Sequence, residues 1–155
     1  MTRPGHGNDL KNPSSREANP MELGIFGSKA EETKTHPISA AEYIKAKLDF
    51  EATPYGLKHT LETTPGSVVV VDVRDEEAFR KEHILGATNI PGAEIVKRLA
   101  DLPKDRTIVT YCWDMTCALA PKAALELAQK GFKVQFLAGG IEEWKRKGNP
   151  VKTAA

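Results

Sequence analysis

Two cysteines close together in the sequence indicate thiol chemistry. Cys112 follows a run of strand-forming residues, and Cys117 ends the stretch Trp113-Asp114-Met115-Thr116. A cysteine becomes a nucleophile as its thiolate, which nearby amides and positive charge stabilise. The chain has only 2 cysteines, too few for a disulfide framework, and no clustered histidine partner accompanies them to complete a four-ligand zinc site. Cys112 is therefore the candidate nucleophile, and no metal or cofactor is expected.

The segments on either side of Cys112 predict how it is positioned. Residues 107–111 have strand character, and an Ala- and Leu-rich helical pattern runs from about Pro121 to Lys130. Because proline is favoured at the first helical position, the loop is expected to span Cys112 to Ala120. Ligands of open α/β sheets bind at the carboxyl ends of strands, and helix N-termini favour anions such as a thiolate.

The rest of the chain alternates strands with helices, which predicts an α/β fold. The strongest strand, 67–73, is a continuous β-branched run, so we expect a central parallel sheet flanked by helices on both faces. Ser39 and Glu42 form a capping-box pattern. Strands are predicted at 67–73, 87–90, 107–111 and 133–137, and helices at about 40–50, 55–64, 75–84, 93–99, 121–130 and 141–147.

Composition sets the domain limits and excludes several function classes. Residues 1–35 lack apolar content and are expected to be a disordered or loosely docked tail, with a small apolar cluster at residues 21–26. A single domain is expected over 36–151, and a C-terminal tail over 152–155. The formal net charge is +1, which gives no support for a nucleic-acid or membrane partner. No secretory signal is apparent, so a reducing cytoplasm is expected.

Several stretches in order resemble one family, the rhodanese-like domains. The resemblance covers roughly residues 36–151. Within the family, the chain is similar to single-domain bacterial sulfurtransferase-like proteins with a Cys-x4-Cys active loop. Its first half is carried by Asp72-Val73-Arg74, Glu77, Phe79, His83-Ile84, Gly86-Ala87 and Asn89-Ile90-Pro91. Its second half is carried by Tyr111-Cys112, Ala123-Ala124, Leu127, Gly131-Phe132, Gly139-Gly140-Ile141, Trp144, Gly148 and Pro150.

This resemblance implies a sulfurtransferase that carries sulfane sulfur as a persulfide on Cys112 and passes it to a thiol or to cyanide. The implied active-site loop consists of Trp113, Asp114, Met115, Thr116, Cys117 and Ala118. Asp72 and Arg74 are implied as supporting residues, with Glu77 as the expected acidic partner. His83 is expected to pack and hydrogen-bond, Trp113 to wall the pocket or stand as a surface aromatic, and Trp144 to lie in the core.

The loop departs from the common active pattern in charge. It contains no basic residue, and Asp114 is expected to raise the thiol pKa and to repel an anionic donor such as thiosulfate. A neutral small donor or a protein persulfide is therefore the expected partner. A rival resemblance, to dual-specificity phosphatases, requires an arginine that clamps the phosphoryl group. Position 118 is alanine and no arginine occurs between Arg106 and Arg146, so phosphatase activity is not expected.

Cys117 leaves two interpretations open. It could attack a Cys112 persulfide, which releases hydrogen sulfide and forms a disulfide. The other interpretation is a small, inert residue that packs inward near the helix start.

Two alternatives to the sulfurtransferase also stay open: a non-catalytic rhodanese-like binding module, and a thiol redox sensor that uses Cys112 and Cys117. The physiological donor and acceptor and the oligomeric state do not follow from these residues.

Overall fold

The computed structural model of this protein describes residues 37–154. The N-terminal tail predicted for residues 1–35, including the apolar cluster within it, lies outside the described residues.

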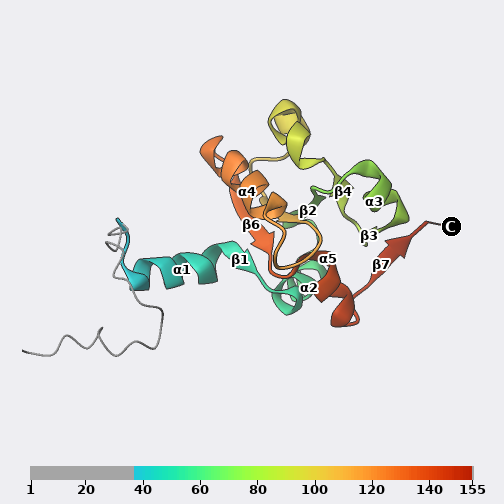
Figure 1. Ribbon diagram of the computed structural model, residues 1–155, viewed down its shortest axis with the longest axis horizontal. Helices are drawn as coiled ribbons and strands as arrows, with labels where there is room; N and C mark the ends of the chain where they lie inside the picture. The colour runs from blue at the N-terminus through green and yellow to red at the C-terminus, as the bar shows by residue number, and fades with distance from the viewer. Residues whose placement is uncertain (1–36, 155) are drawn as a thin grey trace, which may run out of the picture. The chain divides into compact units, whose positions relative to one another are not determined.

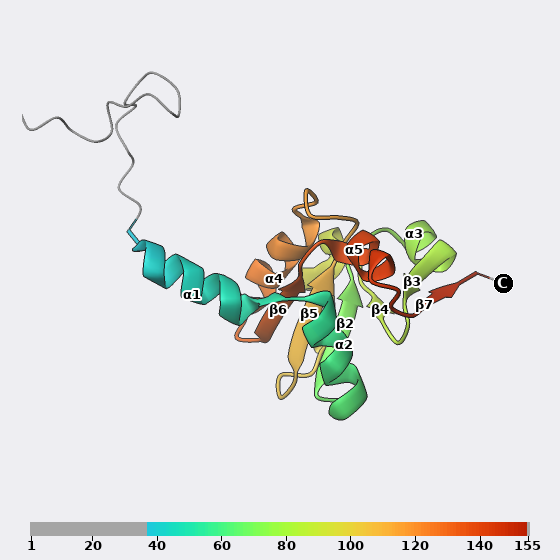
Figure 2. The ribbon, with the colours of Figure 1, turned by 90° about the horizontal axis from the view of Figure 1, so that it is seen from below.

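A sheet of five parallel strands forms the centre of the fold, in the order β1-β6-β5-β2-β4 (Figures 1 and 2). The strands are β1 (Glu51–Ala52), β2 (Val68–Asp72), β4 (Thr88–Asn89), β5 (Thr107–Tyr111) and β6 (Lys133–Leu137). In the register of the two middle strands, Val68 pairs with Thr107 and Asp72 with Tyr111. Because the strands are parallel, the residues that follow Asp72 and Tyr111 emerge at the same edge of the sheet.

Helices cover both faces of this sheet, as the sequence predicts (Figure 2). Against one face, α2 (Pro54–Thr63) and α5 (Gly140–Arg146) contribute Leu57, Ile141 and Trp144 to a buried cluster. Against the other, η2 (Gly92–Asp101) and α4 (Leu119–Gln129) contribute Ile95 and Leu127. Successive valines of β2 point into opposite clusters, since Val70 belongs to the first and Val71 to the second. This two-sided burial explains why the strand is apolar at every position before Asp72.

Local signals set the start of two N-terminal helices. The capping box of α1 (Ala40–Phe50) is formed, because Glu42 N donates to Ser39 Oγ over 3.2 Å and Ser39 N donates to Glu42 Oε2 over 2.7 Å. Pro54 is the first residue of α2, where its missing N–H costs nothing, and Thr53 caps that helix. Among the described residues, no helix combines the length and apolar character that crossing a membrane requires.

The structure corrects the predicted elements in several places, and it adds β1, which the sequence pattern did not predict. The helix expected over 75–84 ends early, as α3 (Glu76–Lys81), and the next residues form β3 (Glu82–Ile84). Strand β3 pairs antiparallel with β7 (Val151–Thr153), so regular pairing continues beyond the domain end expected at residue 151. The helix expected over 93–99 is a kinked 3-10 helix, η2. The pairing of β3 and β7 joins distant segments, which local periodicity does not encode.

Candidate functional site

The loop after β5 is shorter than predicted. Helix α4 begins at Leu119 and not at Pro121, because Lys122 N already donates to Ala118 O over 3.1 Å. Pro121 is then the third helical residue, where its backbone nitrogen needs no partner within the helix. Residues 112–118 therefore form the loop. Ala118 makes no side-chain cap, so the first amides of α4 remain available to other acceptors.

Cys112 lies at the base of this loop and is buried, with 2% of its surface exposed. Its thiol donates a hydrogen bond to the backbone carbonyl of Cys117, with Sγ and O 3.3 Å apart. Burial, together with the neighbouring Cys117 side chain, raises the pKa of the Cys112 thiol to about 11, although amides of Ala120 and Trp113 act in the opposite direction. These two amides favour the thiolate, but they do not outweigh burial, so they do not by themselves ionise Cys112.

The pKa of the Cys117 thiol is shifted in the opposite direction to that of Cys112. It is half-buried, and both cysteines are free. Burial opposes its ionisation, but the Cys112 thiol and the amides of Leu119 and Trp113 outweigh burial and lower the pKa of Cys117. The two thiols therefore titrate as one pair, and the first proton lost leaves a charge that Cys117 holds best.

Asp114 organises the loop and does not act on Cys112 in the way predicted. Its Oδ1 accepts hydrogen bonds from Thr116 N at 2.8 Å, Thr116 Oγ1 at 2.7 Å and Cys117 N at 3.2 Å. The bonds from Thr116 lower the pKa of Asp114, so this side chain stays ionised. The prediction that Asp114 raises the thiol pKa was wrong for Cys112, because burial is the largest cause of the raised pKa there.

Helix α5 holds the first two residues of the loop from the other side. Ile141 N donates to Cys112 O and Glu142 N donates to Trp113 O, each over 3.0 Å. This approach depends on Gly140, which has φ +57°, because a Cβ there would lie 2.5 Å from Cys112 O and 2.7 Å from Trp113 C. The Gly139-Gly140 pair, predicted only as a tight turn, is thus part of the support for the loop.

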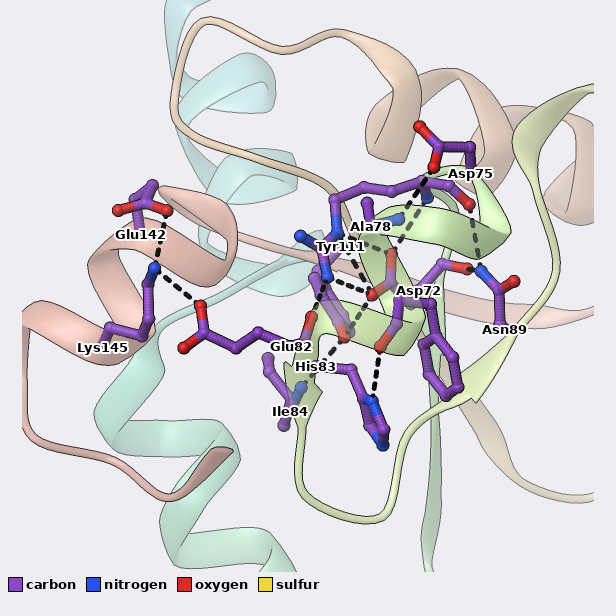
Figure 3. A network of polar contacts seen from close by, with 12 residues as sticks. Asp72, Asp75, Ala78, Glu82, His83, Ile84, Asn89, Tyr111, Glu142 and Lys145 are labelled. Atoms are coloured by element: carbon purple, nitrogen blue, oxygen red, sulfur yellow. Dashed lines mark hydrogen bonds and ion pairs between the residues drawn. The ribbon is translucent and has the colours of Figure 1, made fainter. Parts of the chain in front are cut away.

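A buried polar network fixes the neighbouring end of β2 (Figure 3). Asp72 and Arg74 form an ion pair, with Nη2 and Oδ2 2.7 Å apart, and their side chains are 0% and 2% exposed. Tyr111 Oη donates to Asp72 Oδ2 over 2.6 Å and accepts from Ile84 N over 3.0 Å. Arg74 Nη2 also donates to Glu82 O over 2.6 Å. A buried charge pair needs such additional hydrogen bonds to offset its desolvation.

This network reaches the loop through Trp113. The Arg74 guanidinium carbon lies 4.4 Å from the centre of the Trp113 ring, a cation–π contact. Trp113 is 43% exposed, so its other side faces outward beside the loop. The expected pairing with Glu77 is wrong, since Glu77 pairs with Lys81 on the surface and Asp72 is the acidic partner of Arg74.

A groove adjoins the outer part of the loop. It has a volume of about 780 Å³. Its lining residues are Pro54, Asp114, Met115, Ala138, Gly139, Glu142, Glu143, Lys145 and Arg146. Both basic side chains are already paired with acids, Lys145 with Glu82 and Glu142, and Arg146 with Glu143. The groove therefore offers no uncompensated positive charge of its own to an anion.

Three further residues singled out in the sequence are either exposed at the loop tip or packed in the structure. Met115 is 85% exposed at the tip of the loop, and Trp144 is 1% exposed in the core. His83 packs against Phe79, with ring centres 3.8 Å apart, and its Nδ1 contacts Phe79 O at 2.8 Å. The packing roles predicted for His83 and Trp144 are thus confirmed.

Sequence reasoning missed the part played by Tyr111. It was predicted as the last residue of a strand, but its hydroxyl joins Asp72 to β3. The available signal was a phenol in an otherwise apolar strand, directly before the candidate nucleophile.

These features define an α/β domain whose cysteine-containing loop lies between a parallel strand and a helix. The sequence profile described as "Rhodanese-like domain" matches residues 54–147 of the chain. The chain therefore belongs to the rhodanese-like domain family.

The relatives of this chain include proteins with different named functions. The chain is 44% identical over 90 residues to the HTH-type transcriptional regulator Rv0324 of Mycobacterium tuberculosis, a match that covers 58% of this chain and only 40% of the regulator. It is 35% identical over 85 residues to a sulfurtransferase of Allochromatium vinosum, covering 54% of this chain and 78% of that protein. The crystal structure of the BH2092 protein from Bacillus halodurans superposes with a TM-score of 0.69 at 38% identity, covering 74% of this chain and 84% of that one. Sulfurtransferases are thus present among its relatives.

Proposed function

We propose that this protein is a sulfurtransferase that carries sulfane sulfur as a persulfide on Cys112 and passes it to a thiol or to cyanide. The observation that carries the proposal is the placement of Cys112. It follows the middle strand β5, at the base of the loop, where the amides of Trp113 in the loop and Ala120 in α4 favour its thiolate. A thiolate at this position attacks the outer sulfur of a donor, and the donor's leaving group departs with the electron pair.

The contact between the two thiols allows a Cys112 thiolate to form despite the raised pKa of Cys112. Because Cys112 and Cys117 titrate as a pair, the pair can lose one proton before Cys112 alone would ionise. A proton that passes from Cys112 to Cys117 leaves Cys112 as the reacting thiolate. The buried site then protects the persulfide that forms there.

The charges around the loop favour a neutral donor. Asp114 is ionised, and both basic side chains of the adjoining groove are paired with carboxylates. Thiosulfate carries two negative charges and gains little from such surroundings. A neutral organic persulfide or polysulfide, or a protein persulfide, is the better partner. The proposal places the reaction in the cytoplasm, where both thiols remain reduced.

A donor panel tests this proposal. Wild type, Cys117→Ser and Cys112→Ser are incubated with thiosulfate, an organic trisulfide or an organic persulfide, and intact mass and peptide mapping locate the added sulfur. In Cys117→Ser, which lacks a second thiol that could react with the persulfide, we expect one sulfur atom on Cys112 with the neutral donors and less with thiosulfate at equal concentration. Absence of any adduct on Cys112 of Cys117→Ser with every donor would contradict the assignment.

A second candidate is a non-catalytic rhodanese-like module within a regulatory system. The observation in its favour is the 44% identity to part of a transcriptional regulator, combined with the burial of the Cys112 thiol. In that case Cys112→Ser leaves the cellular role intact, whereas the sulfurtransferase loses it.

A further inference from the structure

The second cysteine of the loop is held against the first by the fold of the loop itself. A turn at Asp114–Cys117, with Cys117 N donating to Asp114 O over 3.3 Å, brings the chain back toward Cys112. Asp114 Oδ1 fixes the same turn by accepting from the backbone amides of Thr116 and Cys117. The contact that results is the hydrogen bond from Cys112 Sγ to Cys117 O at 3.3 Å. Cys117 is therefore a neighbour of the Cys112 sulfur itself.

The two thiols also differ in the way that a nucleophile and its target should. Cys112 is 2% exposed, whereas Cys117 is half-buried and accessible from the solvent side. Ala118 does not cap α4, so the first amides of the helix are free to bond the thiols. The amide of Ala120 stabilises the thiolate of Cys112, and the amide of Leu119 stabilises that of Cys117. An inert packing residue needs no such stabilisation of its anion.

We propose that Cys117 resolves the Cys112 persulfide by attacking its inner sulfur, so that the loop releases sulfide and closes as a Cys112–Cys117 disulfide. This inference rests on the proposed function, because it needs a persulfide on Cys112. In the step, the Cys117 thiolate forms a bond to Cys112 Sγ, and the bond between Sγ and the outer sulfur breaks. The outer sulfur leaves as hydrosulfide with the electron pair. The sulfane sulfur is thereby reduced, and the two cysteines are oxidised.

The structure favours attack on the inner rather than the outer sulfur. Cys112 Sγ contacts both the backbone oxygen of Cys117, at 3.3 Å, and the Cys117 side chain, and this Sγ becomes the inner sulfur when a donor adds the outer one. The reaction is also intramolecular within one loop, which favours it strongly over attack by a free thiol. The disulfide must then be reduced by two equivalents of a thiol, or by one dithiol, before the next cycle. In the absence of an acceptor the product is therefore sulfide.

A single-turnover measurement tests the inference. Reduced wild type, Cys112→Ser, Cys117→Ser and Cys117→Ala are loaded with one equivalent of an organic persulfide, without reductant. Released sulfide is measured over time, and peptide mapping locates persulfide and disulfide. We expect wild type to release sulfide and form the disulfide, and both Cys117 variants to retain the Cys112 persulfide with sulfide release slower by more than about tenfold. Wild type without donor, handled in parallel, should form no disulfide.

The outcomes separate this inference from the proposed function. If the Cys117 variants carry no sulfur on Cys112, the proposed function fails and the resolving step fails with it. If they carry it but wild type releases sulfide no faster than they do, only the resolving role of Cys117 is overturned. Persulfide found on Cys117 in wild type, with no disulfide, also overturns it, because that result means attack on the outer sulfur. Unfolding curves matching wild type exclude misfolding as the cause of a difference.

Discussion

Replacing Gly140 by alanine should destabilise the protein through the loop that holds Cys112. The new Cβ lies 2.5 Å from Cys112 O and 2.7 Å from Trp113 C, too close to be accommodated without moving helix α5 away from the loop. That movement weakens the hydrogen bonds from Ile141 N and Glu142 N to the carbonyls of the loop. We therefore expect both a loss of stability and a change in the reactivity of the loop cysteines.

The expected size follows from two contributions. A non-glycine residue in the left-handed region costs about 1 kcal/mol, and two hydrogen bonds contribute about 1 kcal/mol each. The free energy of unfolding of Gly140→Ala should thus fall by about 3 kcal/mol. Gly66→Ala is the matched control, because Gly66 has φ +83° and nothing within 4 Å of its added Cβ. It should lose only about 1 kcal/mol.

Urea unfolding of wild type, Gly140→Ala and Gly66→Ala measures this difference, with unchanged m-values as the check on two-state behaviour. Alanine restricts the unfolded chain at either position, so that contribution largely cancels between the variants. Alkylation rates of both cysteines provide the second measurement, and they should change only in Gly140→Ala. Equal destabilisation of the two variants, with unchanged alkylation, would refute the idea that α5 holds the loop through Gly140.

Three further predictions concern the same site. Tyr111→Phe leaves Ile84 N without its acceptor and Asp72 Oδ2 without one donor, so the free energy of unfolding should fall by about 2 kcal/mol. Tyr43→Phe, at an exposed tyrosine, is the control and should leave the free energy of unfolding nearly unchanged. Equal effects of the two variants in denaturant unfolding would argue against the network. Burial and, after it, the Cys117 side chain raise the pKa of Cys112 to about 11. Cys117→Ser removes the second of these causes, so the rise of Cys112 alkylation with pH should move to lower pH; a midpoint that stays or rises contradicts this reasoning. Asp114→Ala removes the side-chain oxygen that accepts from Thr116 N and Cys117 N, whereas Asp114→Asn keeps a side-chain oxygen as acceptor. Hydrogen exchange at these two amides should quicken in Asp114→Ala and change little in Asp114→Asn. Equal protection in both variants would show that the Asp114 side chain does not order the turn.

Local signals in the sequence were sufficient for much of the framework. The continuous apolar run before Asp72 predicted a strand buried on both faces, because only a covered parallel strand is apolar at successive positions. The Ser39 and Glu42 pair predicted the start of α1, because a capping box is made by residues close in sequence. The position of Cys112 after a strand and before a helix also followed from local pattern.

Tertiary contacts decided the chemistry of the site. Residues 82–84 leave the predicted helix because β7 and Tyr111, both distant in sequence, and Arg74 offer their backbone groups better partners. The acidic partner of Arg74 is Asp72 and not Glu77, because both buried charges must satisfy each other away from water. Residue types alone showed that Cys112 and Cys117 share one loop. The folded turn at Asp114, the first amides of α4 and the burial of Cys112 in the cluster beneath α4 determine which thiol is protected and which holds the charge. A thiol's pKa reflects solvent exclusion and hydrogen bonds that the packed chain supplies.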